Sequence, residues 1–182
     1  EEMRFSIGKA MKIKDVRLKP LFCKFKKPYV WAMGRELGQT TVLIEVETDS
    51  GVVGFGETAP TMIAVDPIIA FLKTAKSVLI GQSVFQISDL MRQVYSNNFG
   101  HSSVSHAHPR VANLAFAGIE MSLWDAFGKS TDLPVHALLG GKIHDTVSFM
   151  GFVQGETTDE LATHAGQLVQ EGYEVIYLKA GR

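Results

Sequence analysis

Residues 171–182 read Glu-Gly-Tyr-Glu-Val-Ile-Tyr-Leu-Lys-Ala-Gly-Arg. They contain a glycine turn and then a β-prone apolar run, which is followed by Lys179. Gly172 ends a helical pattern, and Tyr173–Leu178 then predicts a buried strand. An ammonium at the end of such a strand, here Lys179, must be paired or lose its proton. In a parallel α/β barrel the active site lies at the carboxyl ends of the strands, where a lysine can act as a general base. The alternative is that Lys179 is a solvated residue that opens a loop.

The residues before this run extend the same pattern. Thr146–Gly151 predicts a short strand, and Thr157 with Glu160 forms a capping-box pattern that opens a helix running to Glu171. The strand Glu174–Leu178 follows, and a crossover of this length predicts parallel pairing in a βαβ unit. Two parallel strands cannot build a sheet that is covered on both faces. We therefore expect these 182 residues to be part of a longer polypeptide in which a parallel α/β domain begins.

The N-terminal third predicts an antiparallel sheet. Met11–Cys23 alternates apolar and charged residues, as a half-buried strand does. Thr40–Glu47 is a second strand, and Val52–Glu57 returns after the turn Thr48–Gly51, whose Asp, Ser and Gly favour a reversal. Together they predict a three-stranded antiparallel meander.

Helices are predicted for most of the residues that follow. Asp66 is expected to cap a helix that ends at Gly81, because its carboxylate can accept from free amides. The further predicted helices are Ile87–Tyr95, a long and largely buried helix from Pro109 to about Lys129, and a short helix Val135–Leu139.

The composition narrows the class of protein. The chain is 46% hydrophobic with a formal net charge of -1, which predicts a globular protein without nucleic acid or a membrane surface as its partner. No apolar run reaches the roughly 18 residues of a membrane helix. Cys23 is the sole cysteine, which excludes an intrachain disulfide and favours a reducing cytoplasm. His101, His106 and His108 suggest zinc, but their spacing fits a polar loop better than a metal site.

One block of sequence resembles a known family. Ala117–Gly141 contains Trp-Asp, Gly-Lys, Leu-Pro and Leu-Leu-Gly-Gly in order, and Thr41–Glu57 contains Thr-Asp-Ser-Gly and ends in Gly-Phe-Gly-Glu. Both resemble the mandelate racemase and muconate lactonising enzyme branch of the enolase superfamily. The resemblance implies an α+β capping domain, a three-stranded antiparallel meander plus helices, over residues 1–130. The start of a (β/α)7β TIM-like barrel would follow, with residues 131–182 forming a linker helix and the first βαβ unit.

The resemblance also implies that two cap loops cover the mouth of the barrel and select the substrate. These loops correspond to the loop-like segments Phe22–Gly38 and Thr58–Val65. Alternatively, the aromatic residues of the first segment fold back onto the sheet. If the loops do line a pocket, the candidates for substrate contact are Tyr29, Trp31, Thr61, Met62 and Ile63.

In this family the second barrel strand ends in Lys-x-Lys, and the final lysine abstracts the proton beside the substrate carboxylate. Lys179 matches that lysine, whereas Tyr177 stands in place of the first lysine and is expected to face the pocket. The resemblance implies Mg²⁺ as cofactor, held by carboxylates of later strands, so the metal ligands are expected beyond Arg182. Asp145, Glu156 and Asp159 lie too early in the barrel pattern to be ligands.

These observations predict the N-terminal part of a magnesium-dependent enzyme that abstracts a proton alpha to the carboxylate of a small substrate. A racemase, epimerase or cycloisomerase is expected, with an acid-sugar dehydratase of the same superfamily as the alternative. This chain alone is expected to be incomplete and inactive, and the whole enzyme to be a homo-oligomer. The hypothesis from another class is a binding or structural module without chemistry.

Overall fold

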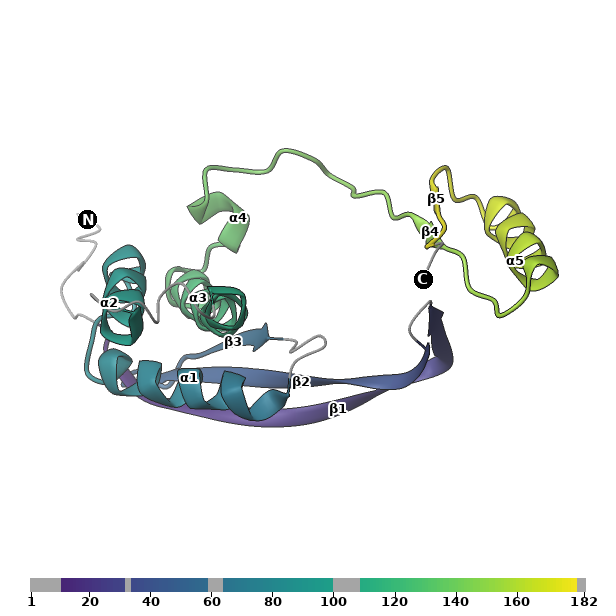
Figure 1. Ribbon diagram of the computed structural model, residues 1–182. Coiled ribbons are helices and arrows are strands. Elements are labelled where there is room, and N and C mark those ends of the chain that lie inside the picture. The colour runs from purple at the N-terminus through teal and green to yellow at the C-terminus, as the bar shows by residue number, and fades with distance from the viewer. Residues whose placement is uncertain (1–10, 32–33, 59–63, 100–108, 180–182) are drawn as a thin grey trace. The chain divides into compact units, whose positions relative to one another are not determined.

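The computed structural model describes residues 11–31, 34–58, 64–99 and 109–179, which belong to two compact units (Figure 1). One unit comprises Glu1–Leu21 and Thr40–Gly141, and the other comprises Phe22–Gln39 and Lys142–Arg182. The first unit therefore holds the sheet and the helical core. The second unit combines the outer part of the first hairpin with the βαβ segment at the end of the sequence.

The sheet has three strands, β1 (Ile13–Trp31), β2 (Gly34–Thr48) and β3 (Val53–Thr58), in the order β1-β2-β3. β2 and β3 pair antiparallel from Val42 opposite Thr58 to Glu47 opposite Val53. The predicted antiparallel meander is therefore confirmed.

The prediction of a loop over Phe22–Gly38 is wrong. β1 continues to Trp31 and β2 begins at Gly34, so that nearly the whole segment is β-strand. Pro28 suggested a loop because proline lacks an N–H group. However, β1 lies at the edge of its sheet, where a proline removes no ladder hydrogen bond on the outer side.

Four helices complete the first unit: α1 (Val65–Leu79), α2 (Ile87–Phe99), α3 (Pro109–Thr131) and α4 (Val135–Leu138). The first three share one apolar core with the inner face of the sheet, and that core includes fully buried Ile44, Leu72, Leu90 and Phe116. None of the helices among the described residues is long and apolar enough to cross a membrane.

The expected cap of α1 is wrong in one detail. The residue at the N-cap is Ala64, which makes no side-chain capping bond, and Asp66 lies inside the first turn. A carboxylate there still favours the helix, because the N-terminal end of a helix carries partial positive charge.

The central helix α3 meets β3 through backbone atoms. A Cβ on Gly56 would lie 1.9 Å from the Gly118 carbonyl oxygen, and a Cβ on Gly54 would lie 2.1 Å from the Ser122 carbonyl oxygen. Both distances are far below van der Waals contact, so only glycine fits at these two positions of β3. The pair Gly54 and Gly56 therefore sets how closely the long helix approaches the sheet.

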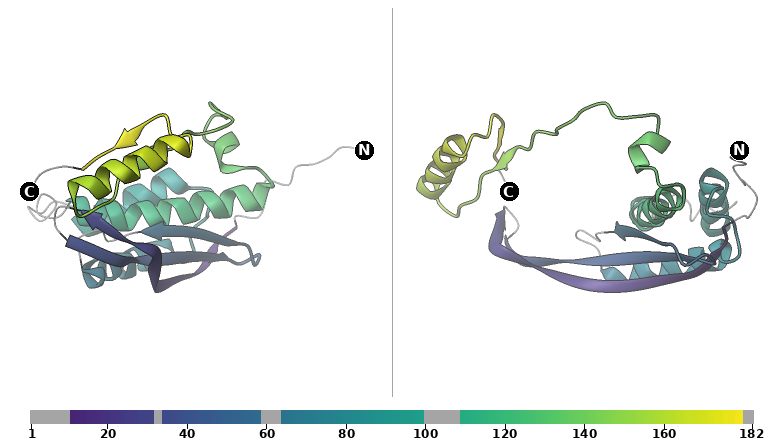
Figure 2. Two further views of the ribbon diagram at one scale, coloured as in Figure 1. Left: turned by 90° about the vertical axis from the view of Figure 1, so that its right-hand side faces the viewer. Right: turned by 180° about the vertical axis from the view of Figure 1, so that it is seen from behind.

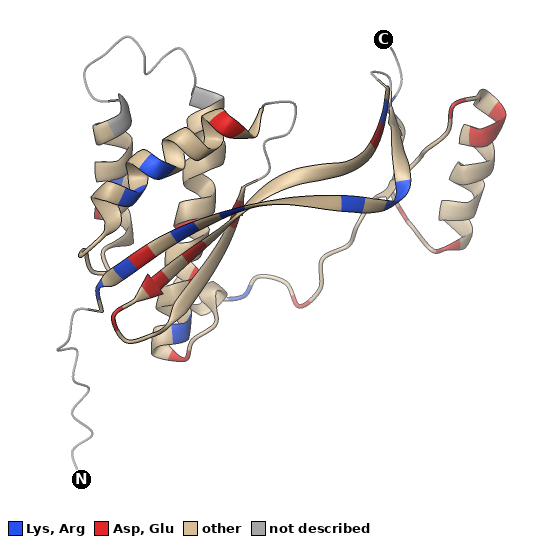
Figure 3. Cartoon of the chain, turned by 90° about the horizontal axis from the view of Figure 1, so that it is seen from below, with Lys and Arg blue, Asp and Glu red and all other residues tan. Residues whose placement is uncertain are grey.

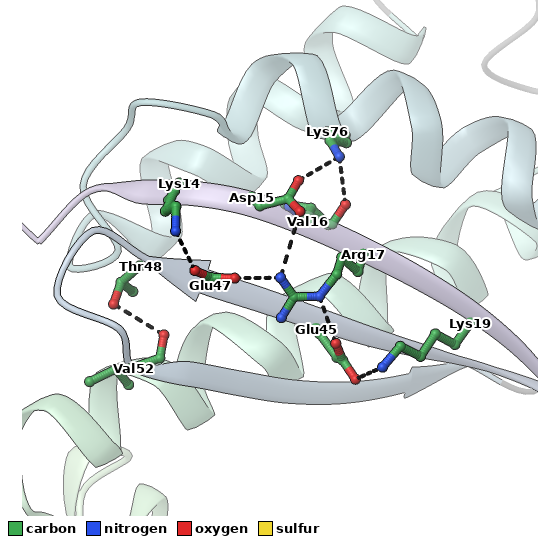
Figure 4. A network of polar contacts seen from close by, with 10 residues as sticks. All are labelled: Lys14, Asp15, Val16, Arg17, Lys19, Glu45, Glu47, Thr48, Val52 and Lys76. Carbon is green, nitrogen blue, oxygen red and sulfur yellow. Dashed lines mark hydrogen bonds and ion pairs between the residues drawn. The ribbon is translucent and has the colours of Figure 1, made fainter.

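The opposite face of the sheet carries a network of charges (Figures 3 and 4). Arg17 of β1 contacts both Glu45 and Glu47 of β2, with 2.8 Å from its Nε to Glu45 Oε2. Lys14 Nζ lies 2.7 Å from Glu47 Oε1, and Lys19 Nζ lies 2.5 Å from Glu45 Oε1. Hydrogen bonds from Lys19 and then Arg17 lower the pKa of Glu45, and those from Lys14 and then Arg17 lower the pKa of Glu47.

The charge network extends to α1 through a separate pair. Lys76 Nζ lies 2.7 Å from Asp15 Oδ1 and donates to the Val16 carbonyl oxygen at 2.8 Å. The hydrogen bond from Lys76 is the main cause that lowers the pKa of Asp15. This pair therefore joins the edge strand β1 to the helix that packs beside it.

The second unit contains the predicted βαβ segment (Figure 2). β4 (Gly151–Phe152) pairs parallel with β5 (Ile176–Tyr177), and α5 (Thr158–Gln170) connects them. Thr157 accepts from the Glu160 backbone N–H, and the Glu160 side chain accepts from the Thr157 N–H, so the predicted capping box is confirmed. Parallel pairing of the last strand is confirmed as well.

Both strands of this unit are shorter than predicted for Thr146–Gly151 and Glu174–Leu178, and their flanking apolar residues are exposed, as expected for strands whose further barrel neighbours are not among the described residues. The side chain of Phe149 is 80% exposed and that of Leu178 is 52% exposed. A strand is regular only where a neighbour completes its hydrogen bonds, and among the described residues β4 and β5 have only each other.

We expect Gly56→Ala to lower the free energy of unfolding by about 3 kcal/mol, the upper end for overpacking, because a methyl group has no space against the α3 backbone. Chemical denaturation measures this change. The matched control is Gly166→Ala on α5, where a Cβ meets nothing within 4 Å and alanine favours the helix. Equal stability of Gly56→Ala and wild type would contradict the close backbone contact.

The charge network predicts loss of stability in acid. Because the pKa values of Glu45, Glu47 and Asp15 are lowered in the folded state, their contribution is present above the ordinary carboxyl pKa and is lost as the pH falls below about 4.5. Glu45→Gln should give a shallower decline in denaturation midpoint between neutral and acid pH. Asp132→Asn, at an exposed carboxylate that has no ion pair among the described residues, should keep the wild-type slope; an unchanged slope in Glu45→Gln would argue against the network.

Candidate functional site

The second unit contains an open cavity of about 550 Å³. Its walls come from the outer part of the β1–β2 hairpin, from the end of β4 and the residues that follow it, from α5, and from Lys179, which follows β5. The lining residues are Val30, Trp31, Gly34, Arg35, Phe152, Val153, Gly155, Glu156, Leu161 and Lys179. The cavity thus lies at the carboxyl ends of the two parallel strands, where the sequence predicted an active site.

Two of the predicted site residues meet in this cavity. The Nζ atom of Lys179 lies 4.1 Å from the centre of the Trp31 ring, within the range of a cation–π contact. Lys179 itself is exposed in the described chain rather than buried. The Trp31 ring therefore contacts an exposed amine at the cavity.

Aromatic rings connect the hairpin with both parallel strands. The ring centroids of Trp31 and Tyr29 are 6.4 Å apart, those of Tyr29 and Phe152 are 5.3 Å apart, and those of Phe152 and Tyr177 are 5.0 Å apart. Such separations are typical of favourable aromatic pairs. Tyr29 and Tyr177, both predicted site residues, therefore support the wall of the cavity through Phe152 rather than lining it among the described residues.

The environment of the wall raises the pKa of the Tyr29 phenol. Burial is the main cause that raises the pKa of Tyr29, and the charges of Glu36 and Tyr177 raise it further. Because the ordinary phenol pKa is already 10.0, Tyr29 remains a protonated hydrogen-bond donor near neutral pH.

Several residues of the site were not predicted. Arg35 and Glu156 face each other across the cavity with 3.9 Å between Arg35 Nη1 and Glu156 Oε1, and both side chains are about 60% exposed. Gln154 accepts from the Val30 backbone N–H at 2.6 Å. The signal that could have found Gln154 is its position three residues after the predicted strand Thr146–Gly151, on the segment that leaves the carboxyl end of that strand.

The remaining predicted contacts, Thr61, Met62 and Ile63, lie outside the described residues. A metal site is not formed within the described chain either: nowhere in the ranges 11–31, 34–58, 64–99 and 109–179 do three His, Cys, Asp or Glu residues come together to hold an ion. The described residues therefore do not by themselves fit a magnesium ion.

A three-stranded antiparallel sheet with a helical core is the architecture of a capping domain, and a βαβ unit with a lysine after its second strand follows it along the chain. The family model "Mandelate racemase / muconate lactonizing enzyme, N-terminal domain" matches residues 14–140. The match covers more than half of the chain, and the chain belongs to this family.

Known proteins resemble the chain over most of its length. A D-mannonate dehydratase of Caulobacter vibrioides is 30% identical over 145 residues, which is 79% of this chain and 34% of that protein. A muconate lactonizing enzyme of Pseudomonas fluorescens, solved with muconolactone, has 25% identity and a TM-score of 0.80 over 95% of this chain and 46% of its own.

A dipeptide epimerase of Cytophaga hutchinsonii, solved with Mg and the dipeptide D-Ala-L-Val, shares the fold with a TM-score of 0.80 at 24% identity, over 94% of this chain and 45% of its own. The chain thus spans between about a third and a half of the length of the relatives that it matches.

We expect Phe152→Ala to lower the pKa of Tyr29 toward 10.0, because removal of the neighbouring ring lets water reach the phenol. A pH titration followed by NMR of ring-labelled tyrosine measures this change. Phe149→Ala removes a ring that is 80% exposed on the same segment, and it should leave the titration of Tyr29 unchanged. If both variants titrate like wild type, Phe152 does not bury Tyr29.

Proposed function

We propose that the chain is the N-terminal part of a longer enzyme that removes the proton alpha to the carboxylate of a small substrate, with Lys179 as the base. The observation that carries this proposal is the position of Lys179 at the carboxyl end of β5, in a cavity of about 550 Å³. A volume of this size is usual for small-molecule sites. Family membership supports the same proposal, since the relatives named above are a dipeptide epimerase, a muconate lactonizing enzyme and a D-mannonate dehydratase.

The residues of this chain would perform three tasks. The Lys179 amine accepts the proton when it is unprotonated, and the Trp31 ring would stabilise the ammonium that forms. The aromatic wall formed by Tyr29, Phe152 and Tyr177 limits the access of water from one side. An apolar wall of this kind favours a substrate less polar than a polyhydroxylated sugar acid.

The proposal includes Mg²⁺ with its ligands beyond Arg182, because a carboxylate that loses an alpha proton develops a second negative charge. The support is indirect: the Cytophaga epimerase was crystallised with Mg. Since the described residues bring no ligand set together, no step of the reaction is assigned to the ion here.

Two types of reaction are compatible with removal of an alpha proton. A racemase, epimerase or cycloisomerase fits the aromatic wall, whereas an acid-sugar dehydratase is favoured by the 30% identity to the Caulobacter enzyme. Product analysis separates them, because a dehydratase releases water, whereas a racemase or epimerase inverts the alpha carbon and a cycloisomerase forms a cyclic isomer of unchanged composition. A cytoplasmic homo-oligomer is part of the proposal in either case.

The rival from another class is a binding or structural module without chemistry. The length of the native protein separates the two, because the rival is complete at 182 residues and the enzyme is not. Intact mass of the natural protein close to 20.0 kDa would favour the module, and a mass about twice as large would support the enzyme.

In the longer enzyme we expect Lys179→Met to slow removal of the alpha proton by about 10²–10⁴-fold, the usual contribution of a general base. NMR in D₂O with Mg²⁺ measures proton exchange in N-acyl amino acids, dipeptides and sugar acids. Lys142→Met is the control, since Lys142 lies in the same unit and pairs with Asp145 at 2.6 Å. If the longer enzyme with Lys179→Met exchanges the alpha proton as fast as wild type, Lys179 is not the base.

A further inference from the structure

Gln154 joins three segments of the second unit. Its side-chain Oε1 accepts from the Val30 N–H of the hairpin at 2.6 Å, and its own backbone N–H donates to His164 Nδ1 of α5 at 2.8 Å. The first bond spans 124 residues of sequence. The side chain of Gln154 therefore connects the hairpin to the segment after β4, and its backbone N–H connects that segment to the crossover helix α5.

The bond to Val30 acts directly on the cavity. Val30 precedes Trp31, both residues line the cavity, and the Trp31 ring lies 4.1 Å from the amine of Lys179. β1 is an edge strand, so the N–H groups on its outer side have no ladder partner. Gln154 supplies the partner at Val30, the residue directly before Trp31.

The side-chain nitrogen of Gln154 makes no hydrogen bond among the described residues. This nitrogen, Nε2, is buried. A buried donor without a partner is unfavourable, so it calls for an explanation other than stability. The geometry explains why an amide side chain stands at this position: its oxygen accepts the hydrogen bond from the Val30 N–H.

We infer that Gln154 is a positioning residue: its side-chain oxygen fixes the Val30–Trp31 backbone, and through it holds the indole over the amine of Lys179. This inference rests on the proposed role of Lys179. Gln154 is not placed in contact with the substrate, and it acts on the reaction only through Trp31 and Lys179.

The test measures the position of the indole over the amine in the 182-residue chain without substrate. Protons above an indole ring experience an upfield ring-current shift, so the ε-methylene signal of Lys179 in isotopically labelled protein should lie upfield of the other lysines. Lys179→Met assigns the signal by its loss, and Trp31→Leu should remove the upfield shift. Absence of the shift in the wild-type chain would overturn the inference.

Two substitutions at residue 154 separate positioning from general packing. Gln154→Met has a similar volume but no acceptor, and the upfield shift of Lys179 should be lost. Gln154→Glu keeps an acceptor for Val30 and should retain the shift. Val30→Pro removes the same hydrogen bond from the hairpin side and should behave like Gln154→Met. Retention of the shift in both Gln154→Met and Val30→Pro would overturn the inference.

Kinetics of the longer enzyme complete the test. Gln154→Met should lower kcat for proton exchange by about tenfold to a hundredfold with little change in KM, because a misplaced base slows chemistry more than binding. Gln154→Glu should retain most of kcat. If Lys179→Met leaves activity intact while the ring-current results hold, the proposed function fails and the positioning of Trp31 by Gln154 stands.

Discussion

The contact of the α3 backbone with the β3 backbone is the constraint on which the first unit depends. Gly54 and Gly56 have no side chains to separate the strand from the helix, so the two backbones approach as closely as their atoms allow. With α3 held there, Phe116, Ile119 and Leu123 reach the core beneath the sheet. β2 pairs with β3 on the side of the strand that does not face α3, from Val42 opposite Thr58 to Glu47 opposite Val53.

The two faces of the sheet carry different kinds of side chain. Near the core, apolar residues of β2 such as Ile44 and Val46 face the helices, while Glu45 and Glu47 pair with cations of β1 on the other face. Beyond Leu21 the strands leave this core and belong to the second unit. There the edge strand makes its contacts through aromatic rings and through the hydrogen bond from Val30 to Gln154.

In the candidate site, aromatic side chains restrain the segment that carries Lys179. Lys179 is exposed and follows a strand of only two residues, so the strand alone would not hold its amine. The indole of Trp31 provides that restraint, and the series Tyr29, Phe152 and Tyr177 links the hairpin to β4 and β5. A base that must meet a carbon acid in a fixed geometry benefits from such a support, since orientation contributes a large part of catalytic rate.

Local patterns in the sequence determined much of this protein. The capping box of Thr157 and Glu160, the parallel pairing of the last strand, and the turn between β2 and β3 were all predicted, because each depends on neighbouring residues or on a fixed chain length. The position of Lys179 at the end of β5 was predicted for the same reason.

Only the tertiary structure decided that Phe22–Gly38 is mostly strand, since the partner and the edge position that tolerate Pro28 are not visible in the segment itself. The same holds for the contact of Trp31 with Lys179 and for the bond from Val30 to Gln154, whose partners are separated by more than a hundred residues. The sequence determined which residues could form the site, because local propensity and spacing depend on nearby residues. The fold decided which of them meet, because contacts between distant segments depend on how the whole chain packs.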